Sequence, residues 1–192
     1  MRRGAARLGV VTGNEGKLRE FRVLAAEYGV EVYQIRALKP EIQADDVRVI
    51  AVASAASLMQ HIREPFIVED AGLFIAALNG FPGPYSAYVL KTIGVDGILK
   101  LMEGVRDRSA RFIAAIAYAD REAGIRVFTG EVKGSIAEEA RGTNGFGFDP
   151  IFVPEGWSRT FAEVGPAEKS RVSHRGRAFR ALMEWLRSER IL

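Results

Sequence analysis

Two adjacent acids, Glu69 and Asp70, directly follow a short apolar run, and this stretch constrains the fold more than any other. The run 66–68 (Phe-Ile-Val), preceded by a proline, predicts a buried strand. Neighbouring strand residues point to opposite faces, so both acids can reach solvent only if the strand ends there, and Gly72 then allows a turn. An unpaired buried carboxylate is costly, so the pair indicates a bound cation, a general base or both. The alternative is an ordinary strand end, where polar residues lead into a loop.

The length and composition of the chain limit the kinds of site it can build. With 192 residues it can bury a substantial core, and we expect a single domain over residues 1–192. The absence of cysteine and the presence of only two histidines exclude thiolate zinc sites, a cysteine nucleophile and a histidine-rich metal centre. Any metal is expected to be a hard, oxygen-bound ion such as Mg²⁺. Residues 1–4 do not resemble a signal peptide, and no apolar run approaches the ~20 residues of a membrane span, so we expect a cytoplasmic protein.

The charge pattern points to phosphate but not to a nucleic-acid tract. The net charge is +3, with 21 arginines against 6 lysines, and arginine favours planar, bidentate contacts with phosphate. The basic residues are spread along the chain without a block of about five or six. We therefore expect neither a nucleic-acid nor a membrane partner.

The order of the expected elements indicates the fold class. Strands and helices alternate in the first half, and two adjacent strands form a hairpin in the second half. This order predicts an α/β protein with a mixed central sheet and helices on both faces. The expected strands cover 8–12, 30–35, 66–68, 109–119 and 125–132. The expected helices cover 15–28, 85–93, 95–102 and 174–190, and a further long helix, capped by Asp45 or Asp46, runs to about 62.

The first strand is followed by a glycine-containing turn and a helix with a lysine in its first turn, over 13–17. Free N–H groups and the helix dipole attract anions at a helix amino end. Lys17 is poorly placed next to that positive end unless an anionic ligand is bound. The alternative is that Asn14 simply caps the helix.

A glycine-rich stretch with two aromatic residues covers 142–152. Three glycines interleaved with Phe146 and Phe148 are poorly suited to a core. They are well suited to bringing backbone close to a flat ligand and placing a ring over it.

The last helix is expected to be capped by Ser173, which places His174 and Arg175 in its first turn. Cations are disfavoured there unless a negative or hydrogen-bonding group faces them. The alternative is a solvated basic helix start.

Five motifs occur in one order along nearly the whole chain. The motifs are 12–17 (Thr-Gly-Asn-Glu-Gly-Lys), 69–73 (Glu-Asp-Ala-Gly-Leu), 81–83 (Phe-Pro-Gly) with Ser86, 145–152, and 173–176 (Ser-His-Arg-Gly). With these motifs the sequence closely resembles the inosine triphosphate pyrophosphatase family. The resemblance implies hydrolysis of non-standard purine nucleoside triphosphates such as ITP, dITP and XTP. It also implies an elongated single domain with two lobes, a nucleotide cleft between them, and a homodimer.

The resemblance also assigns roles to residues of this chain. It implies Asp70 as the general base, and Mg²⁺ held by Glu41 and Asp70 with Glu69 close by. Water would attack the α-phosphorus, giving the monophosphate and pyrophosphate. Many family members have serine where this chain has Ala71, so the substrate contact of that hydroxyl is missing. The implied substrate-binding residues are Thr12, Gly13, Asn14, Glu15, Gly16, Lys17, Ala71, Phe146, Gly147, Phe148, Asp149, Lys169, His174 and Arg175.

Base selection is expected to depend on Arg175. A donor to the purine O6 is satisfied by inosine or xanthine, whereas adenine presents an N6 donor and leaves the arginine unpaired. An unpaired buried donor costs ~1–3 kcal/mol.

Two other functions fit part of the sequence. A nucleic-acid-binding module would use the arginines and exposed Phe146 and Phe148, but it explains neither Glu69 nor Asp70. Another nucleotide pyrophosphatase, with different base or phosphate selectivity, would share most of the motifs.

Overall fold

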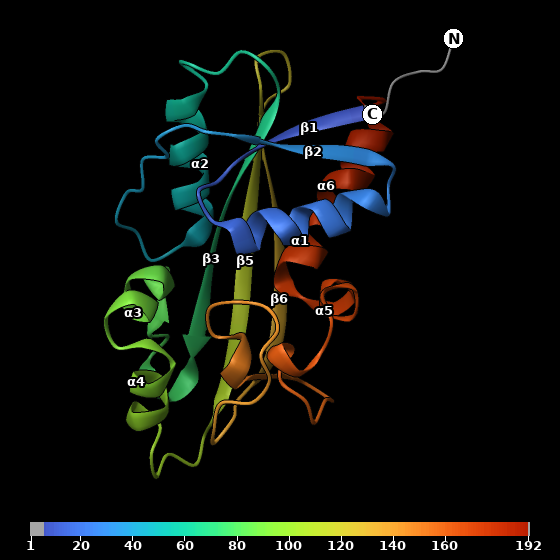
Figure 1. The fold of residues 1–192 in the computed structure, drawn as a ribbon. Helices are drawn as coiled ribbons and strands as arrows, with labels where there is room; N and C mark the ends of the chain where they lie inside the picture. Colours follow the sequence, from blue (N-terminus) through green and yellow to red (C-terminus); the bar gives the residue numbers. More distant parts are fainter. Residues whose placement is uncertain (1–5, 192) are drawn as a thin grey trace.

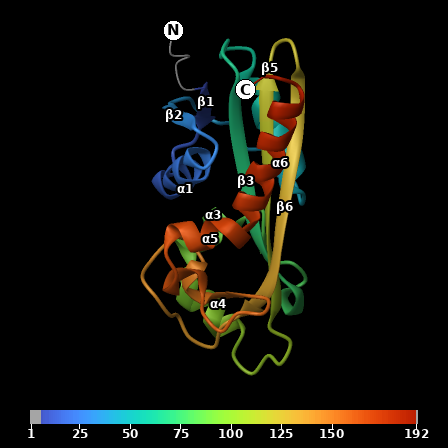
Figure 2. The ribbon, with the colours of Figure 1, turned by 90° about the vertical axis from the view of Figure 1, so that its right-hand side faces the viewer.

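A long twisted sheet runs through the molecule, and helices cover both of its faces (Figures 1 and 2). The computed structural model describes residues 6–191. The strand order is β2-β1-β3-β5-β6-β7, and β4 pairs with β3. The strands are β1 Ala6–Val11, β2 Val30–Ile35, β3 Phe66–Ile75, β4 Pro82–Gly83, β5 Ser109–Asp120, β6 Gly124–Ile136 and β7 Phe152–Pro154. The helices are α1 Glu15–Ala26, α2 Val47–Leu58, α3 Ser86–Thr92, α4 Gly94–Leu101, α5 Pro166–Val172 and α6 His174–Ser188, with short 3-10 turns at Ala76–Leu78, Asp149–Ile151 and Phe161–Glu163.

The sheet is mixed, as predicted. β1 pairs in parallel with β2 and β3, whereas β3, β5, β6 and β7 pair antiparallel to one another. The predicted hairpin is formed by β5 and β6, which are in register from Ser109–Ser135 to Asp120–Gly124. The prediction of an α/β fold with helices on both faces is confirmed.

Three apolar clusters hold the helices against the sheet. One packs α1 and α6 on the face that carries Ile67 and Ile116. A second packs α2 on the opposite face, where alanines of α2 and β5 allow close approach. The third lies at the other end of the long strands, beneath α3, α4 and the segment around Phe161. The first two clusters form one lobe and the third forms the other, so the molecule is elongated (Figure 2).

Local signals predicted the start of each main helix. Asn14, Asp46 and Ser173 each accept a hydrogen bond from a backbone N–H in the first turn of α1, α2 and α6. Such caps satisfy donors that have no partner within the helix. Helix α5 and strands β4 and β7, which contain seven, two and three residues, were not predicted.

The prediction that the acidic strand ends at Glu69 and Asp70 is wrong. β3 continues to Ile75 and pairs with β5 along its whole length. The strand that ends is β1, whose pairing with β3 stops at Val68. Beyond that point one edge of β3 is free of its neighbour, and the two acids lie at the opening.

The prediction that Gly72 turns the chain is wrong, because the strand continues through it. Gly72 instead allows close packing. A Cβ at this position would overlap the backbone carbonyl of Gly83. Glycine is therefore needed for β4 to pair with β3 at Leu73.

No helix within residues 6–191 is long and apolar enough to cross a membrane. The expectation about a signal peptide concerned residues 1–4, which lie outside the described residues.

Candidate active site

A cavity of about 430 Å³ opens where β1 ends, between the start of α1, the middle of β3, the segment 146–149 and the start of α6. It is therefore a cleft between the two lobes. Most of the predicted site residues line it, although they come from distant parts of the chain. These are Thr12, Gly13, Asn14, Lys17, Glu41, Glu69, Asp70, Ala71, Phe146, Gly147, Phe148, Asp149, Lys169, His174 and Arg175.

Glu15 and Gly16 are the two predicted residues that do not line the cavity. Glu15 is exposed in the first turn of α1. Gly16 is buried against Phe146, and a Cβ there would lie 2.5 Å from the ring. Gly16 therefore sets how closely the Phe146 ring approaches α1.

The helix-capping role of Asn14 is present in the structure. Its side chain accepts the N–H of Lys17 at 3.0 Å, and its own N–H donates to Thr12 Oγ1 at 3.1 Å. These bonds fix the turn between β1 and α1 and place the first turn of the helix at the cavity.

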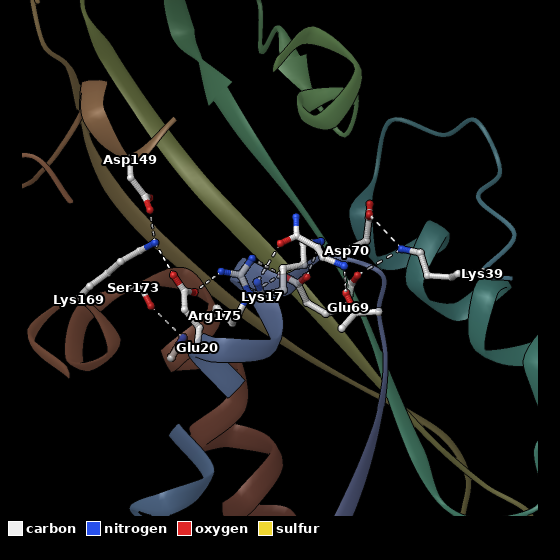
Figure 3. A network of polar contacts seen from close by, with 12 residues as sticks. Lys17, Glu20, Lys39, Glu69, Asp70, Asp149, Lys169, Ser173 and Arg175 are labelled. Carbon is white, nitrogen blue, oxygen red and sulfur yellow. Dashed lines mark hydrogen bonds and ion pairs between the residues drawn. The ribbon is translucent and has the colours of Figure 1, made fainter. Parts of the chain in front are cut away.

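Six charged side chains form a chain of ion pairs along the cavity, which we call the buried charge row (Figure 3). Its members alternate in sign and are brought together from α1, β3, α5, α6 and the segment 146–149. In spatial order they are Asp149, Lys169, Glu20, Arg175, Glu69 and Lys17.

The contacts within the buried charge row are short and mostly buried. Lys169 Nζ lies 2.5 Å from both Glu20 Oε1 and Asp149 Oδ2. Arg175 donates to Glu20 through Nη1 and to Glu69 Oε1 through Nε and Nη2, at 3.1 and 2.9 Å. Lys17 Nζ lies 2.7 Å from Glu69 Oε2 as an ion pair, without the alignment of a hydrogen bond.

Glu69 is charged in this setting. Burial on its own raises the pKa of Glu69, but the charges of Arg175 and Lys17 outweigh burial and lower it to about 2. Its carboxylate anchors Arg175 and Lys17 on the face of the sheet covered by α1 and α6.

The start of α6 is not a solvated basic turn. Arg175 and His174 are 2% and 3% exposed. The guanidinium of Arg175 uses all three of its nitrogens on Glu20 and Glu69 and lies 5.4 Å from the centroid of the Phe146 ring. These carboxylates are the negative partners that the first helix turn required.

His174 is a neutral group with an unsatisfied nitrogen. Burial, together with the nearby charges of Arg175, Lys169 and Lys17, lowers the pKa of His174 well below its usual value. Its ring stacks on Phe112 at 4.6 Å between centroids. Nδ1 has no hydrogen-bond partner among residues 6–191.

The segment 146–149 is part core and part cavity wall. Asp149 accepts the N–H of Phe146 at 2.8 Å, which closes a turn. Phe146 is half-buried, with Lys169 Nζ 5.0 Å from its centroid. Phe148, however, is buried in the cluster beneath α3 and α4. The expectation of two exposed aromatic residues is therefore wrong for Phe148, whose ring has the apolar neighbours to fill a core.

Asp70 points to the opposite face of β3 from Glu69. Burial is the main reason that the pKa of Asp70 is raised to about 6. The positive charges of Lys17 and Lys39 lower this pKa, whereas the negative charges of Glu69 and Glu41 raise it further. Its Oδ2 is buried and has no hydrogen-bond partner within the described chain. Asp70 therefore lines the cavity and has one buried oxygen without a partner in the described chain.

Glu41 lies in the loop between β2 and α2, and its side chain is 58% exposed. Lys39 Nζ joins it to Asp70, at 2.8 Å from Glu41 Oε1 and 3.7 Å from Asp70 Oδ1. Within residues 6–191, Glu41, Glu69 and Asp70 do not form a group of three acids that could hold a metal. Glu69 is instead committed to Arg175 and Lys17.

The oxygens of Glu41 and Asp70 nevertheless fit a hard cation. The ammonium of Lys39 stands among them as a cation, and it also donates to the backbone carbonyl of Glu69 at 3.4 Å. Carboxylate and carbonyl oxygens are the ligands of Mg²⁺. The unpaired Oδ2 of Asp70 adds a further donor atom.

Sequence reasoning missed two charged residues at the site. Glu20 joins Lys169 to Arg175 and is buried on α1. Its position four residues after Gly16 places both on one helix face, and this spacing was the sequence signal that Glu20 faces the site. Lys39 lines the cavity beside Glu41, and its place before Pro40 in the same loop was the available signal.

Comparison with known proteins settles the family. A model of the Ham1 family matches residues 8–185 of the chain. The chain belongs to the Ham1 family. The Ham1 protein of Staphylococcus aureus has the same fold, with a TM-score of 0.80 and 29% identity over 95% of this chain and 99% of that one. The predicted family membership is confirmed.

Relatives with curated names are more similar in sequence. The dITP/XTP pyrophosphatase of Thermococcus kodakarensis is 54% identical over 94% of this chain and 97% of its own length. That of Methanopyrus kandleri is 50% identical over 92% and 94%. A solved dITP/XTP pyrophosphatase from Mycobacterium abscessus has 35% identity and a TM-score of 0.70 over 92% of this chain and 98% of that one.

Proposed function

We propose that this Ham1 protein hydrolyses non-standard purine nucleoside triphosphates, namely dITP, ITP and XTP, to the monophosphate and pyrophosphate. One observation carries the proposal. A single interlobe cavity holds a carboxylate of raised pKa, Asp70, between the amino end of α1 and the pocket formed by Phe146 and His174. These three parts suit the scissile phosphate, the leaving pyrophosphate and the base, respectively.

The phosphates bind at the start of α1. The first-turn N–H groups and Lys17 supply positive charge at the cavity. Lys17 is the most exposed member of the buried charge row, with its side chain 19% exposed, so it can turn from Glu69 to a phosphate. Neutralising the leaving pyrophosphate stabilises the charge that develops in the transition state.

The base binds between Phe146 and His174. The Phe146 ring is available for stacking, and its position is held by Gly16 and by the turn to Asp149. The unpartnered Nδ1 of neutral His174 suits one polar atom of the purine. Arg175 donates its remaining N–H groups to O6, which favours hypoxanthine and xanthine over adenine.

Asp70 is the general base. Its carboxylate accepts a proton as water attacks the α-phosphorus, and the bond to the bridging oxygen breaks to release pyrophosphate. Glu41 and Asp70 would hold Mg²⁺, with Glu69 close by, and the ion would supply Lewis-acid neutralisation of phosphate charge. Ala71 offers only its backbone where a serine hydroxyl is usual.

We propose that the protein acts as a homodimer. We also propose that it is located in the cytoplasm, where the nucleotide pool lies. Exposed apolar side chains on and near α3 and α4, including Tyr88, Ile93 and Leu101, support self-association.

The proposal is tested with a panel of nucleoside triphosphates and Mg²⁺, scored separately for pyrophosphate and orthophosphate. We expect pyrophosphate from dITP, ITP and XTP and much less from ATP. Orthophosphate as the main product, or equal rates for ATP and ITP, contradicts the proposal and favours a pyrophosphatase or phosphatase of different selectivity.

A further inference from the structure

Lys39 occupies a position that belongs chemically to a cation ligated by oxygen. It lies in the loop between β2 and α2, and its side chain is only 16% exposed although the loop is at the surface. Its ammonium faces three oxygens from two segments: Glu41 Oε1 at 2.8 Å, the Glu69 carbonyl at 3.4 Å and Asp70 Oδ1 at 3.7 Å. Figure 3 shows Lys39 reaching Asp70 from the side opposite Lys17.

The ammonium of Lys39 and a divalent ion would compete for these oxygens. Glu41 and Asp70 carry two negative charges in a partly buried place, where charge interactions are several times stronger than in water. The ammonium of Lys39 offsets part of this negative charge. A divalent cation brought to the same place is repelled by that ammonium.

We propose that Lys39 is a built-in counterion that competes with the divalent cation for Glu41 and Asp70. This inference rests on the proposed function for the place of the cation. The free protein then binds the cation weakly, because binding requires Lys39 to leave both carboxylates. Lys39 also lines the cavity, so the displaced ammonium turns toward the space where anionic phosphates bind.

The test measures cation affinity without nucleotide or turnover. Mn²⁺ is titrated into the full chain, and free Mn²⁺ is followed by electron paramagnetic resonance. Lys39→Met removes the charge but keeps an unbranched side chain, and we expect Mn²⁺ to bind about tenfold more tightly than to wild type. Lys39→Arg keeps the charge and is expected to bind as weakly as wild type.

Two further variants locate the effect. Lys91→Met removes an equal charge from the exposed face of α3 and is expected to match wild type. Asp70→Asn in the Lys39→Met background is expected to abolish the gain, because it removes a carboxylate that the cation uses. Circular dichroism checks folding, and Lys39→Gln replaces Lys39→Met if the latter does not fold.

The proposal is overturned if Lys39→Met binds Mn²⁺ no more tightly than wild type, including no binding at all. It is also overturned if Lys91→Met gains as much, since general charge would then explain the change. Failure to hydrolyse dITP would contradict the proposed function and leave the comparison of Mn²⁺ affinities intact.

Discussion

Arg175 and Glu69 are 106 positions apart in sequence and form a buried, two-pronged ion pair, with Nε and Nη2 of the arginine at 3.1 and 2.9 Å from one carboxylate oxygen. The pair attaches the first turn of α6 to the middle of β3. Lys17 contacts the second oxygen of Glu69. Glu69 therefore links Arg175, on the side of the cavity proposed for the base, to Lys17, on the side proposed for the phosphates.

Removing Arg175 is expected to weaken both stability and selectivity. Arg175→Ala leaves Glu69 and Glu20 short of a buried partner, and breaking such a pair costs about 3–5 kcal/mol of unfolding free energy. Urea unfolding measures this loss, with exposed Arg22→Ala on α1 as control. Below the melting temperature, the ratio of kcat/KM for ITP to that for ATP should fall about tenfold. An unchanged ratio with lost stability would make Arg175 purely structural.

The lowered pKa of Glu69 predicts a pH-dependent contribution to stability. The carboxylate titrates near 4.5 when unfolded and at about 2 when folded. Its contribution is therefore fully present above pH 4.5 and is lost as pH falls from 4.5 toward 2, with a size on the order of 3 kcal/mol. Glu69→Gln cannot titrate, so its melting temperature should fall less than that of wild type between pH 5 and pH 3. Parallel curves would contradict the assignment.

Asp70 is expected to be needed for turnover but not for folding. Asp70→Asn keeps the size of the side chain but removes the charge and the proton acceptor. Loss of a general base lowers the rate by about 10²–10⁴-fold. Turnover of dITP is measured beside circular dichroism of the folded variant. Turnover within threefold of wild type would exclude the role.

Loss of Lys17 is expected to weaken binding of the nucleoside triphosphate but not of the nucleoside. Lys17→Met should weaken binding of dITP about tenfold, because it removes one charge-assisted contact at the phosphates. Binding of deoxyinosine, which has no phosphate, should stay within about twofold. Calorimetry of both ligands makes the comparison, and equal losses would assign Lys17 to the support of Glu69 alone.

Gly72 is expected to be required for the packing of β4. Gly72→Ala places a methyl group against the Gly83 carbonyl and should cost about 1–3 kcal/mol of unfolding free energy. Gly165→Ala is the matched control, because nothing lies within 4 Å of a Cβ there and its φ of −73° suits alanine. Equal melting temperatures for the two variants would contradict the packing argument.

Local chemistry made the helix starts predictable from sequence. Asn14, Asp46 and Ser173 cap the helices that follow them, because the cap and the N–H groups it satisfies are three residues apart or fewer. The first strands were predictable for the same reason, since a strand interior is an apolar run.

Long-range partners were not predictable in this way. Lys169 and Glu20 are 149 positions apart, and no local pattern connects them. The course of β3 past Glu69 depends on where the neighbouring β1 ends, which is a property of the sheet. Residues of the cavity were found through the resemblance to a family, whereas the partners that hold them appear only in the fold.

The strict alternation of sign along the buried charge row limits how this cavity can change in evolution. Three carboxylates and three cationic groups compensate one another, so a single replacement that removes or reverses one charge leaves another charge unpaired away from water. A variant that keeps the charges of the row balanced therefore changes two oppositely charged members together, such as Glu20 and Lys169, and single-site libraries would pass over it.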